Sequence, residues 1–192
     1  MKHYMEITAL PCPDVGVHFI LEKVFRQIHL ALVKLKKPNG SVPVGISFPE
    51  YDGAKNRLGT KIRLFAAREE ELAALNMVEH MSGFRDYVHV TGIRRVPEKA
   101  LSYASYARSQ PKSSNLRLAR RKAARGGIAL EKAVQLLSQY EEARVDTPFI
   151  NIMSDSTGRR FRLFILKQEK DGFMNEGFNS YGLSSKSSLP EF

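Results

Sequence analysis

In the first half of the chain, segments whose apolar residues have the two-residue period of a strand alternate with segments that have the 3.6-residue period of a helix. Alternation over residues 3–10 predicts a strand, because successive strand side chains point to opposite faces. Apolar residues three and four positions apart over residues 17–37 predict a helix, which ends at Pro38-Asn39-Gly40. The same criteria predict one short helix at residues 69–77 and further strands at residues 42–48, 61–66 and 87–96.

This order of strand, helix, strand, strand, helix and strand is typical of the ferredoxin-like fold, which RNA-recognition modules also use. Pro97 begins a looser stretch, and the second half then predicts two helices and three strands. The helices cover residues 113–125 and 130–143, and the strands cover residues 149–153, 160–167 and 177–183. We therefore expect an α+β protein with a ferredoxin-like (RRM-like) domain at residues 1–96 and a C-terminal α/β domain at residues 97–192.

Composition narrows the class of protein. The hydrophobic fraction of 43% is ordinary for a globular chain. No apolar run reaches the ~18 residues that a membrane span needs, and Glu6 stands where a signal peptide would be apolar. The single cysteine, Cys12, excludes an internal disulfide and a multi-cysteine zinc site. We expect a soluble cytoplasmic protein that needs no cofactor.

Positive charge is concentrated in one segment. The chain has a net charge of +10, and residues 99–130 contain no Asp or Glu. The basic residues of this segment are Lys99, Arg108, Lys112, Arg117, Arg120, Arg121, Lys122 and Arg125. A block of this kind is typical of a protein that binds a polyanion, although a solvated charge run is an alternative. A membrane surface is disfavoured, because the segment lacks a large apolar face.

Four of these arginines share one face of the helix predicted at residues 113–125. At 100° per residue, Arg117, Arg120, Arg121 and Arg125 fall within an arc of about 140° and along about 12 Å of helix axis. Leu116, Ala119 and Ala123 lie opposite and are available for packing. Such a row suits phosphates along a groove of a nucleic-acid helix, and in A-form RNA it would contact mainly phosphates. The pattern alone does not distinguish RNA from DNA.

The candidate catalytic groups are individually ambiguous. The five histidines, His3, His18, His29, His80 and His89, lack the spacing of a zinc site. His29 lies beside the apolar stripe of its helix, where an ordinary core histidine is the simpler interpretation. Residues 154–158, Ser-Asp-Ser-Thr-Gly, suit either an anion-binding turn or a plain hairpin, and Tyr181 is equally open.

Several short motifs occur together and in a fixed order. They are His-Tyr-x-x-Ile at residues 3–7, Ile-His-Leu-Ala-Leu at 28–32, Gly-Ile-Ser-Phe-Pro at 45–49, Arg-Ser-Gln-Pro-Lys-Ser at 108–113, Ser-Thr-Gly at 156–158, Phe-Arg-Leu-Phe-Ile at 161–165 and Tyr-Gly-Leu-Ser at 181–184. In this combination the chain resembles, over nearly its whole length, the repeat-cleaving endoribonuclease of the type I-F CRISPR system. That enzyme is the Csy, or Yersinia-subtype, member of the Cas6 endoribonucleases.

The resemblance implies an enzyme that cuts precursor CRISPR RNA at the base of each repeat hairpin without a metal ion. His29 would deprotonate the ribose 2′-hydroxyl, which would attack the adjacent phosphate and leave a cyclic phosphate end. Ser154 would orient that ribose and Tyr181 would position His29. RNA contacts would come from Arg108, Gln110, Lys112, Arg117, Arg120, Arg121, Lys122, Arg125, Ser156, Thr157 and Phe161. Arg108 and Gln110 would read base edges, and Phe161 would stack on the terminal base of the stem.

The resemblance also implies partners: the precursor and mature CRISPR RNA, and other Cas subunits of the RNA-guided complex. Only RNA carries the attacking hydroxyl, so no DNA cleavage is expected. Two positions depart from the family pattern. Ala124 replaces an arginine, so a phosphate contact is missing or taken over by Lys122. Asp155 replaces a neutral polar residue, and we expect its carboxylate to point away from the scissile phosphate. A non-catalytic RNA-hairpin-binding module and a metal-dependent nuclease remain the alternatives.

Overall fold

The computed structural model describes residues 1–98, 102–110, 115–137, 146–154 and 158–192. The chain divides into two units, which are described separately. One consists of residues 1–109 and 147–192, and the other of residues 110–146. This division differs from the boundary expected after residue 96, because the sheet formed by the second half belongs to the larger unit.

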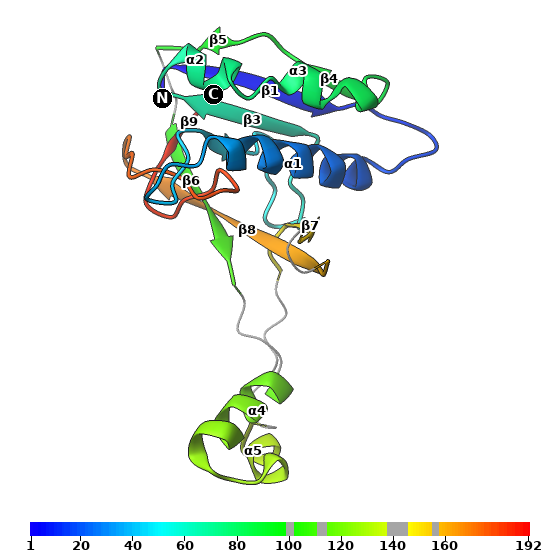
Figure 1. The fold of residues 1–192 in the computed structure, drawn as a ribbon, viewed down its shortest axis with the longest axis vertical. Coiled ribbons are helices and arrows are strands. Elements are labelled where there is room, and N and C mark those ends of the chain that lie inside the picture. Colours follow the sequence, from blue (N-terminus) through cyan, green and yellow to red (C-terminus); the bar gives the residue numbers. More distant parts are fainter. Residues whose placement is uncertain (99–101, 111–114, 138–145, 155–157) are drawn as a thin grey trace. The chain divides into compact units, whose positions relative to one another are not determined.

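The first sheet of the larger unit is antiparallel and has the order β2-β3-β1-β4, with β5 also paired to β1 (Figure 1). Its strands are β1 (His3–Ala9), β2 (Gly45–Ser47), β3 (Lys61–Ala66), β4 (Val88–Val90) and β5 (Arg94–Arg95). The strand predicted at residues 61–66 is confirmed, and those predicted at residues 3–10 and 42–48 are confirmed with shifts at their ends. The single strand predicted at residues 87–96 is wrong in extent, because the chain forms two short strands there.

Helix α1 (Val17–Lys34) runs across the first sheet and carries an apolar stripe into the core (Figure 1). The stripe consists of Ile20, Leu21, Val24, Phe25, Ile28, Ala31 and Leu32, which are all buried. The single helix predicted at residues 69–77 is wrong: the structure has α2 (Glu69–Ala73) and α3 (Met77–His80), followed by the 3-10 turn η1 (Ser82–Phe84). Asn76 separates the helices with a φ of +45°, a left-handed conformation that an α-helix cannot continue.

The second sheet, also antiparallel, has the order β7-β8-β6-β9. Its strands are β6 (Ser102–Ser109), β7 (Phe149–Met153), β8 (Arg160–Lys170) and β9 (Leu189–Glu191). Strands at residues 149–153 and from residue 160 were predicted, whereas β6 and β9 were not. The prediction missed β6 because its buried positions are mainly small residues, Ala104, Ser105 and Ala107, with Tyr106 as the only large side chain among them.

The strand predicted at residues 177–183 is wrong. Apart from one bridge between Phe178 and Val42, these residues form a turn rather than a strand. Gly177 and Gly182 have φ angles of +86° and +69°, which strands do not use and which glycine adopts without strain.

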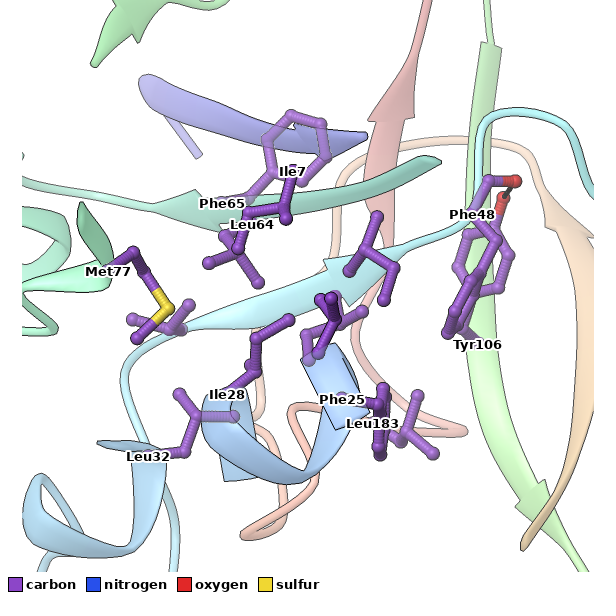
Figure 2. Close-up of a cluster of buried hydrophobic side chains, with 14 of the residues drawn as sticks. Ile7, Phe25, Ile28, Leu32, Phe48, Leu64, Phe65, Met77, Tyr106 and Leu183 are labelled. Atoms are coloured by element: carbon purple, nitrogen blue, oxygen red, sulfur yellow. Dashed lines mark hydrogen bonds between the residues drawn. The ribbon is translucent and has the colours of Figure 1, made fainter. Parts of the chain in front are cut away.

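One hydrophobic core joins the two sheets and α1. Figure 2 shows residues of the first sheet, such as Ile7 and Phe65, in the same cluster as Phe25 of α1, Tyr106 of β6 and Leu183. The Tyr106 hydroxyl oxygen lies 3.2 Å from the carbonyl oxygen of Phe48, a contact drawn as a dashed line in Figure 2. Residues from both halves of the sequence therefore fold as parts of one core.

The smaller unit contains α4 (Asn115–Gly126) and α5 (Leu130–Leu137), which pack against each other. Ala119 and Ala133 are buried in this unit. Both predicted helices are confirmed, although residues 113–114 and 138–143 of the predicted spans lie outside the described residues. The chain is thus a mixed α and β protein with antiparallel sheets. Among the described helices, none combines the length and the apolar character needed to cross a membrane.

Tyr106 gives a test of this core. Its hydroxyl group donates to Glu191 at 2.6 Å, and Glu191 also pairs with Lys167 at 2.6 Å. Burial, together with the neighbouring Glu191 carboxylate, raises the pKa of Tyr106 well above 10.0. We expect Tyr106→Phe to lower the free energy of unfolding by about 1–2 kcal/mol at pH 8, measured by urea denaturation.

The same pKa shift fixes a pH dependence. Unfolded Tyr106 loses its proton above about pH 10 while the folded side chain keeps it, so this contribution to stability falls as the pH rises past 10. The difference in unfolding free energy between the parent and Tyr106→Phe should therefore shrink above pH 10. An identical alkaline decline in both proteins would contradict the assignment.

Candidate active site

The turn at residues 179–184 holds the imidazole of His29. His29 lies on the face of α1 next to Phe25, and its Nδ1 atom is 2.7 Å from the carbonyl oxygen of Ser180. A carbonyl oxygen can only accept a hydrogen bond, so Nδ1 carries the proton. The neutral imidazole then has its lone pair on Nε2, which is the form that can act as a general base.

The ring of Tyr181 fixes the plane of that imidazole. Tyr181 stacks on His29 with ring centroids 4.2 Å apart and an angle of 14° between the planes. On the same helix, the ring of Phe25 lies 6.4 Å from that of Tyr181 at an angle of 11°. One contact through Nδ1 and one through the ring face together determine where Nε2 points. The rings of His29 and Tyr181, two residues that the resemblance placed together, are thus in contact.

Asn179 shapes the turn that carries these contacts. Its side-chain Oδ1 accepts the backbone N–H groups of Tyr181 at 2.8 Å and Leu183 at 3.3 Å. The turn is fixed to β2 through Gly182, whose carbonyl oxygen accepts the N–H of Ile46 at 2.8 Å. A Cβ atom at Gly182 would lie 2.5 Å from the Ile46 side chain, so no larger residue fits there unless Ile46 moves. Asn179 was not predicted as a site residue, although asparagine side chains commonly accept hydrogen bonds from backbone N–H groups two residues further on in turns.

Ser154 lies at the end of β7, where the chain turns back toward β8. Its N–H donates to the carbonyl oxygen of Arg159 at 2.9 Å, and its own carbonyl oxygen accepts the N–H of Gly158 at 2.8 Å. These two bonds continue the antiparallel pairing of β7 with β8. The predicted contacts Ser156 and Thr157, and the departure at Asp155, lie outside the described residues.

Arg108 and Phe161, two of the predicted RNA contacts, lie together on the second sheet. The guanidinium group of Arg108 lies 5.6 Å from the centroid of the Phe161 ring, a distance at which a cation and an aromatic face attract each other. Phe161 is half-buried and Arg108 is exposed. Gln110 is exposed just after the end of β6, and Lys112 lies outside the described residues.

The arginine-rich helix has the exposure that its sequence predicted. In the smaller unit, Arg120, Arg121, Lys122 and Arg125 of α4 are exposed, whereas Ala119 is buried. Arg117 lies within α4, but its side chain is not among those described. No carboxylate stands in α4, so the helix presents cations alone to its surroundings. As for metal sites, no cluster of three or more His, Cys, Asp or Glu side chains suited to a metal ion occurs in the described part of the chain.

Comparison with known proteins identifies the class. Residues 4–192 match the family described as "CRISPR-associated protein (Cas_Csy4)". The chain is 33% identical over 193 residues to the CRISPR-associated endonuclease Cas6/Csy4 of Pseudomonas aeruginosa (strain UCBPP-PA14). It is 32% identical over 194 residues to the protein of that name from Escherichia coli (strain UTI89 / UPEC). Each alignment covers 100% of both proteins.

The chain is therefore a CRISPR-associated protein. Within that class it belongs to the Csy4 family, the Cas6-type endoribonucleases that its motifs already resembled.

Removing the side chain of Asn179 should disturb the imidazole of His29 indirectly, through the turn that holds it. In Asn179→Ala, two N–H groups of the turn lose their acceptor, at a cost of about 1–2 kcal/mol in unfolding free energy. The ring protons of His29, which lie under Tyr181, should change their NMR chemical shifts as the stack loosens. The matched control is Asn175→Ala in the same loop, where the side chain accepts one N–H at a longer 3.4 Å. Equal shifts of the His29 protons in both variants would contradict this role of Asn179.

Proposed function

We propose that this protein is an endoribonuclease that binds the stem-loop of a CRISPR repeat and cuts precursor CRISPR RNA at the base of the hairpin. Two relatives named as CRISPR-associated endonucleases, aligned over their full lengths, support the reaction class. The observation that carries the proposal is the imidazole of His29, whose Nδ1 atom is engaged by the Ser180 carbonyl group. That contact leaves Nε2 to accept a proton.

The proposed reaction is an internal transfer at one phosphate and uses no metal ion. Nε2 of His29 takes the proton of the ribose 2′-hydroxyl group upstream of the cut, and the 2′-oxygen attacks the adjacent phosphorus atom. The bond from phosphorus to the 5′-oxygen of the next nucleotide breaks, that oxygen takes a proton from water, and the protonated His29 returns its proton to the solvent. The products are a 2′,3′-cyclic phosphate and a 5′-hydroxyl end. Ser154 holds the ribose, and Tyr181 holds the imidazole in the plane that attack requires.

Affinity for the hairpin comes from cations that contact phosphates. Arg120, Arg121, Lys122 and Arg125 are exposed along α4, and they suit the deep major groove of an A-form stem. Arg117 extends the same row by its position in the sequence. Phe161 stacks on the terminal base of the stem beside Arg108, and Arg108 and Gln110 read base edges there. Lys112, Ser156 and Thr157 complete the proposed contacts.

The proposal also covers the fold of residues 1–96, the cellular location of the protein and its protein partners. The antiparallel order β2-β3-β1-β4 supports a ferredoxin-like arrangement for residues 1–96. We further propose that the protein works in the cytoplasm, keeps its RNA product and joins other Cas subunits. It would not cleave DNA, which lacks the attacking hydroxyl group.

Substitution of His29 tests the chemistry. In the presence of EDTA, the parent protein should cut the repeat hairpin of its own host. His29→Ala should lose at least about 10²-fold in rate, because it lacks the general base, while hairpin affinity stays within about threefold. Gel analysis of cleavage and binding with the same RNA measures both quantities.

Three other outcomes would redirect the proposal. Full activity in His29→Ala would remove His29 as the base. Loss of parent activity in EDTA would favour a metal-dependent nuclease. Tight binding by the parent without cleavage in any buffer would favour the non-catalytic RNA-hairpin-binding module.

Salt dependence tests the role of α4. The logarithm of the hairpin affinity should fall linearly with the logarithm of the salt concentration, because binding releases counterions from phosphates. Arg121→Ala should reduce the slope by about one unit. Arg57→Ala, which removes an exposed arginine from a loop of the larger unit, is the control and should leave the slope unchanged. An unaltered slope in Arg121→Ala would exclude α4 as the phosphate-binding helix.

A further inference from the structure

The carboxylate of Glu22 joins α1 to both strands of the β7–β8 hairpin. One oxygen, Oε2, accepts a hydrogen bond from the Arg160 guanidinium group of β8 at 2.7 Å. The other oxygen, Oε1, accepts the side-chain amide of Asn151 in β7. His18, one helical turn before Glu22, places its Nε2 atom 3.5 Å from the same oxygen. The Glu22 side chain is only 10% exposed, whereas its partners Arg160 and His18 are 61% and 56% exposed, so a shielded carboxylate meets partners that lie at the surface.

The contacts of Glu22 with Asn151 and Arg160, which form a junction between α1 and the hairpin, lie close to the candidate active site. Glu22 and His29 are seven residues apart on α1, which places them within about 20° of each other around the helix and about 10 Å apart along its axis. Asn151 lies three residues before Ser154 in the sequence. Arg160 pairs directly with Met153, the residue that precedes Ser154. Glu22 therefore contacts both strands of the hairpin close to the end that carries Ser154.

Neighbouring side chains give the junction a definite shape. The ring of His18 meets Phe149 of β7 edge-on at 5.7 Å, and the guanidinium group of Arg162 lies 4.7 Å from the centroid of the same ring. The residues at positions 149, 151, 160 and 162 lie on the same face of the hairpin, because Asn151 pairs with Arg162 and Met153 with Arg160. Hydrogen bonds to a carboxylate are directional, so a shift of this hairpin along α1 would break at least one of them.

We propose that Glu22 is a positioning residue, which holds the hairpin so that Ser154 keeps a fixed place relative to His29. This inference rests on the proposed function, since it concerns the geometry of that reaction. Reactions of this kind lose up to about 10²-fold in rate when the reacting groups are misplaced by 1 Å. The carboxylate touches neither substrate nor reacting atoms and acts only through Asn151, Arg160 and α1.

Positioning and simple stabilisation predict different results. A residue that only stabilises the fold lowers the melting temperature and leaves the chemical step of the folded protein unchanged. A positioning residue slows the chemical step of bound RNA at temperatures where the protein is folded. The measurements are therefore the single-turnover cleavage rate at saturating protein, the affinity for a hairpin carrying a 2′-deoxyribose at the cut, and the melting temperature.

The variants are Glu22→Ala, Glu22→Gln and Asn151→Ala, with Glu70→Ala as the matched control. Glu70 is an exposed carboxylate in α2, so its substitution changes the net charge by the same amount as Glu22→Ala. We expect Glu22→Ala to cleave about tenfold or more slowly, with affinity for the 2′-deoxy hairpin within about threefold of the parent. Glu22→Gln, which keeps an oxygen for Asn151, should recover part of the rate. Asn151→Ala, which alters no charge, should also be slow, and the double variant should be no slower than Glu22→Ala alone.

Each outcome decides a different claim. A cleavage rate of Glu22→Ala equal to that of Glu70→Ala, in a parent protein that does cleave, overturns this inference and leaves the proposed function standing. A loss confined to melting temperature or to affinity assigns Glu22 a structural role and overturns it as well. If Glu22→Ala fails to fold, Asn151→Ala decides: a cleavage rate equal to that of the parent overturns this inference. A parent protein that never cuts the hairpin overturns the proposed function, and this inference with it.

Discussion

The hydrogen bond between Nδ1 of His29 and the carbonyl group of Ser180 is the contact on which the site depends. It joins residues 151 positions apart in the sequence at a distance of 2.7 Å. It determines which nitrogen of the imidazole bears the proton, and the stacked ring of Tyr181 determines the plane of the ring. A histidine on the side of an apolar helix is usually a structural residue. Here the protein backbone occupies one nitrogen, and the other becomes the candidate base.

The larger unit is built in a way that keeps this contact in place. The turn at residues 179–184 is attached to β2 through the hydrogen bond between Ile46 and Gly182, and to β6 through that between Ser184 and Tyr106. Tyr106 is itself buried and bonded to Phe48 and Glu191. The Ser180 carbonyl group is therefore supported from both sheets, while α1 rests on their common core. The position of the imidazole follows from the packing of the whole unit rather than from one loop.

Sequence patterns predicted the parts of this arrangement that depend on local periodicity. Helix α1, strands β1, β3, β7 and β8, and the exposed arginines of α4 all follow from regular spacing of apolar residues. Strand β6 was missed because its buried residues are mostly alanine and serine, and the turn at residues 177–183 was mistaken for a strand. The pairing of His29 with Tyr181 was expected only from the family resemblance. Glu22 could not be found in advance, because its partners Asn151 and Arg160 meet it only when distant segments fold. Asn179 bonds to its own turn, and its relation to His29 emerges only once that turn packs against α1.

The central claim is that His29 presents an unprotonated Nε2 atom, and the tautomer of its imidazole tests this most directly. Nitrogen chemical shifts of ¹⁵N-labelled histidine, assigned to His29 by comparison with a His29→Ala sample, distinguish the two neutral forms. At a pH where the ring is neutral, the structure predicts a proton on Nδ1 and a lone pair on Nε2. A neutral His29 that carries its proton on Nε2 would contradict both the hydrogen bond to Ser180 and the mechanism built on it.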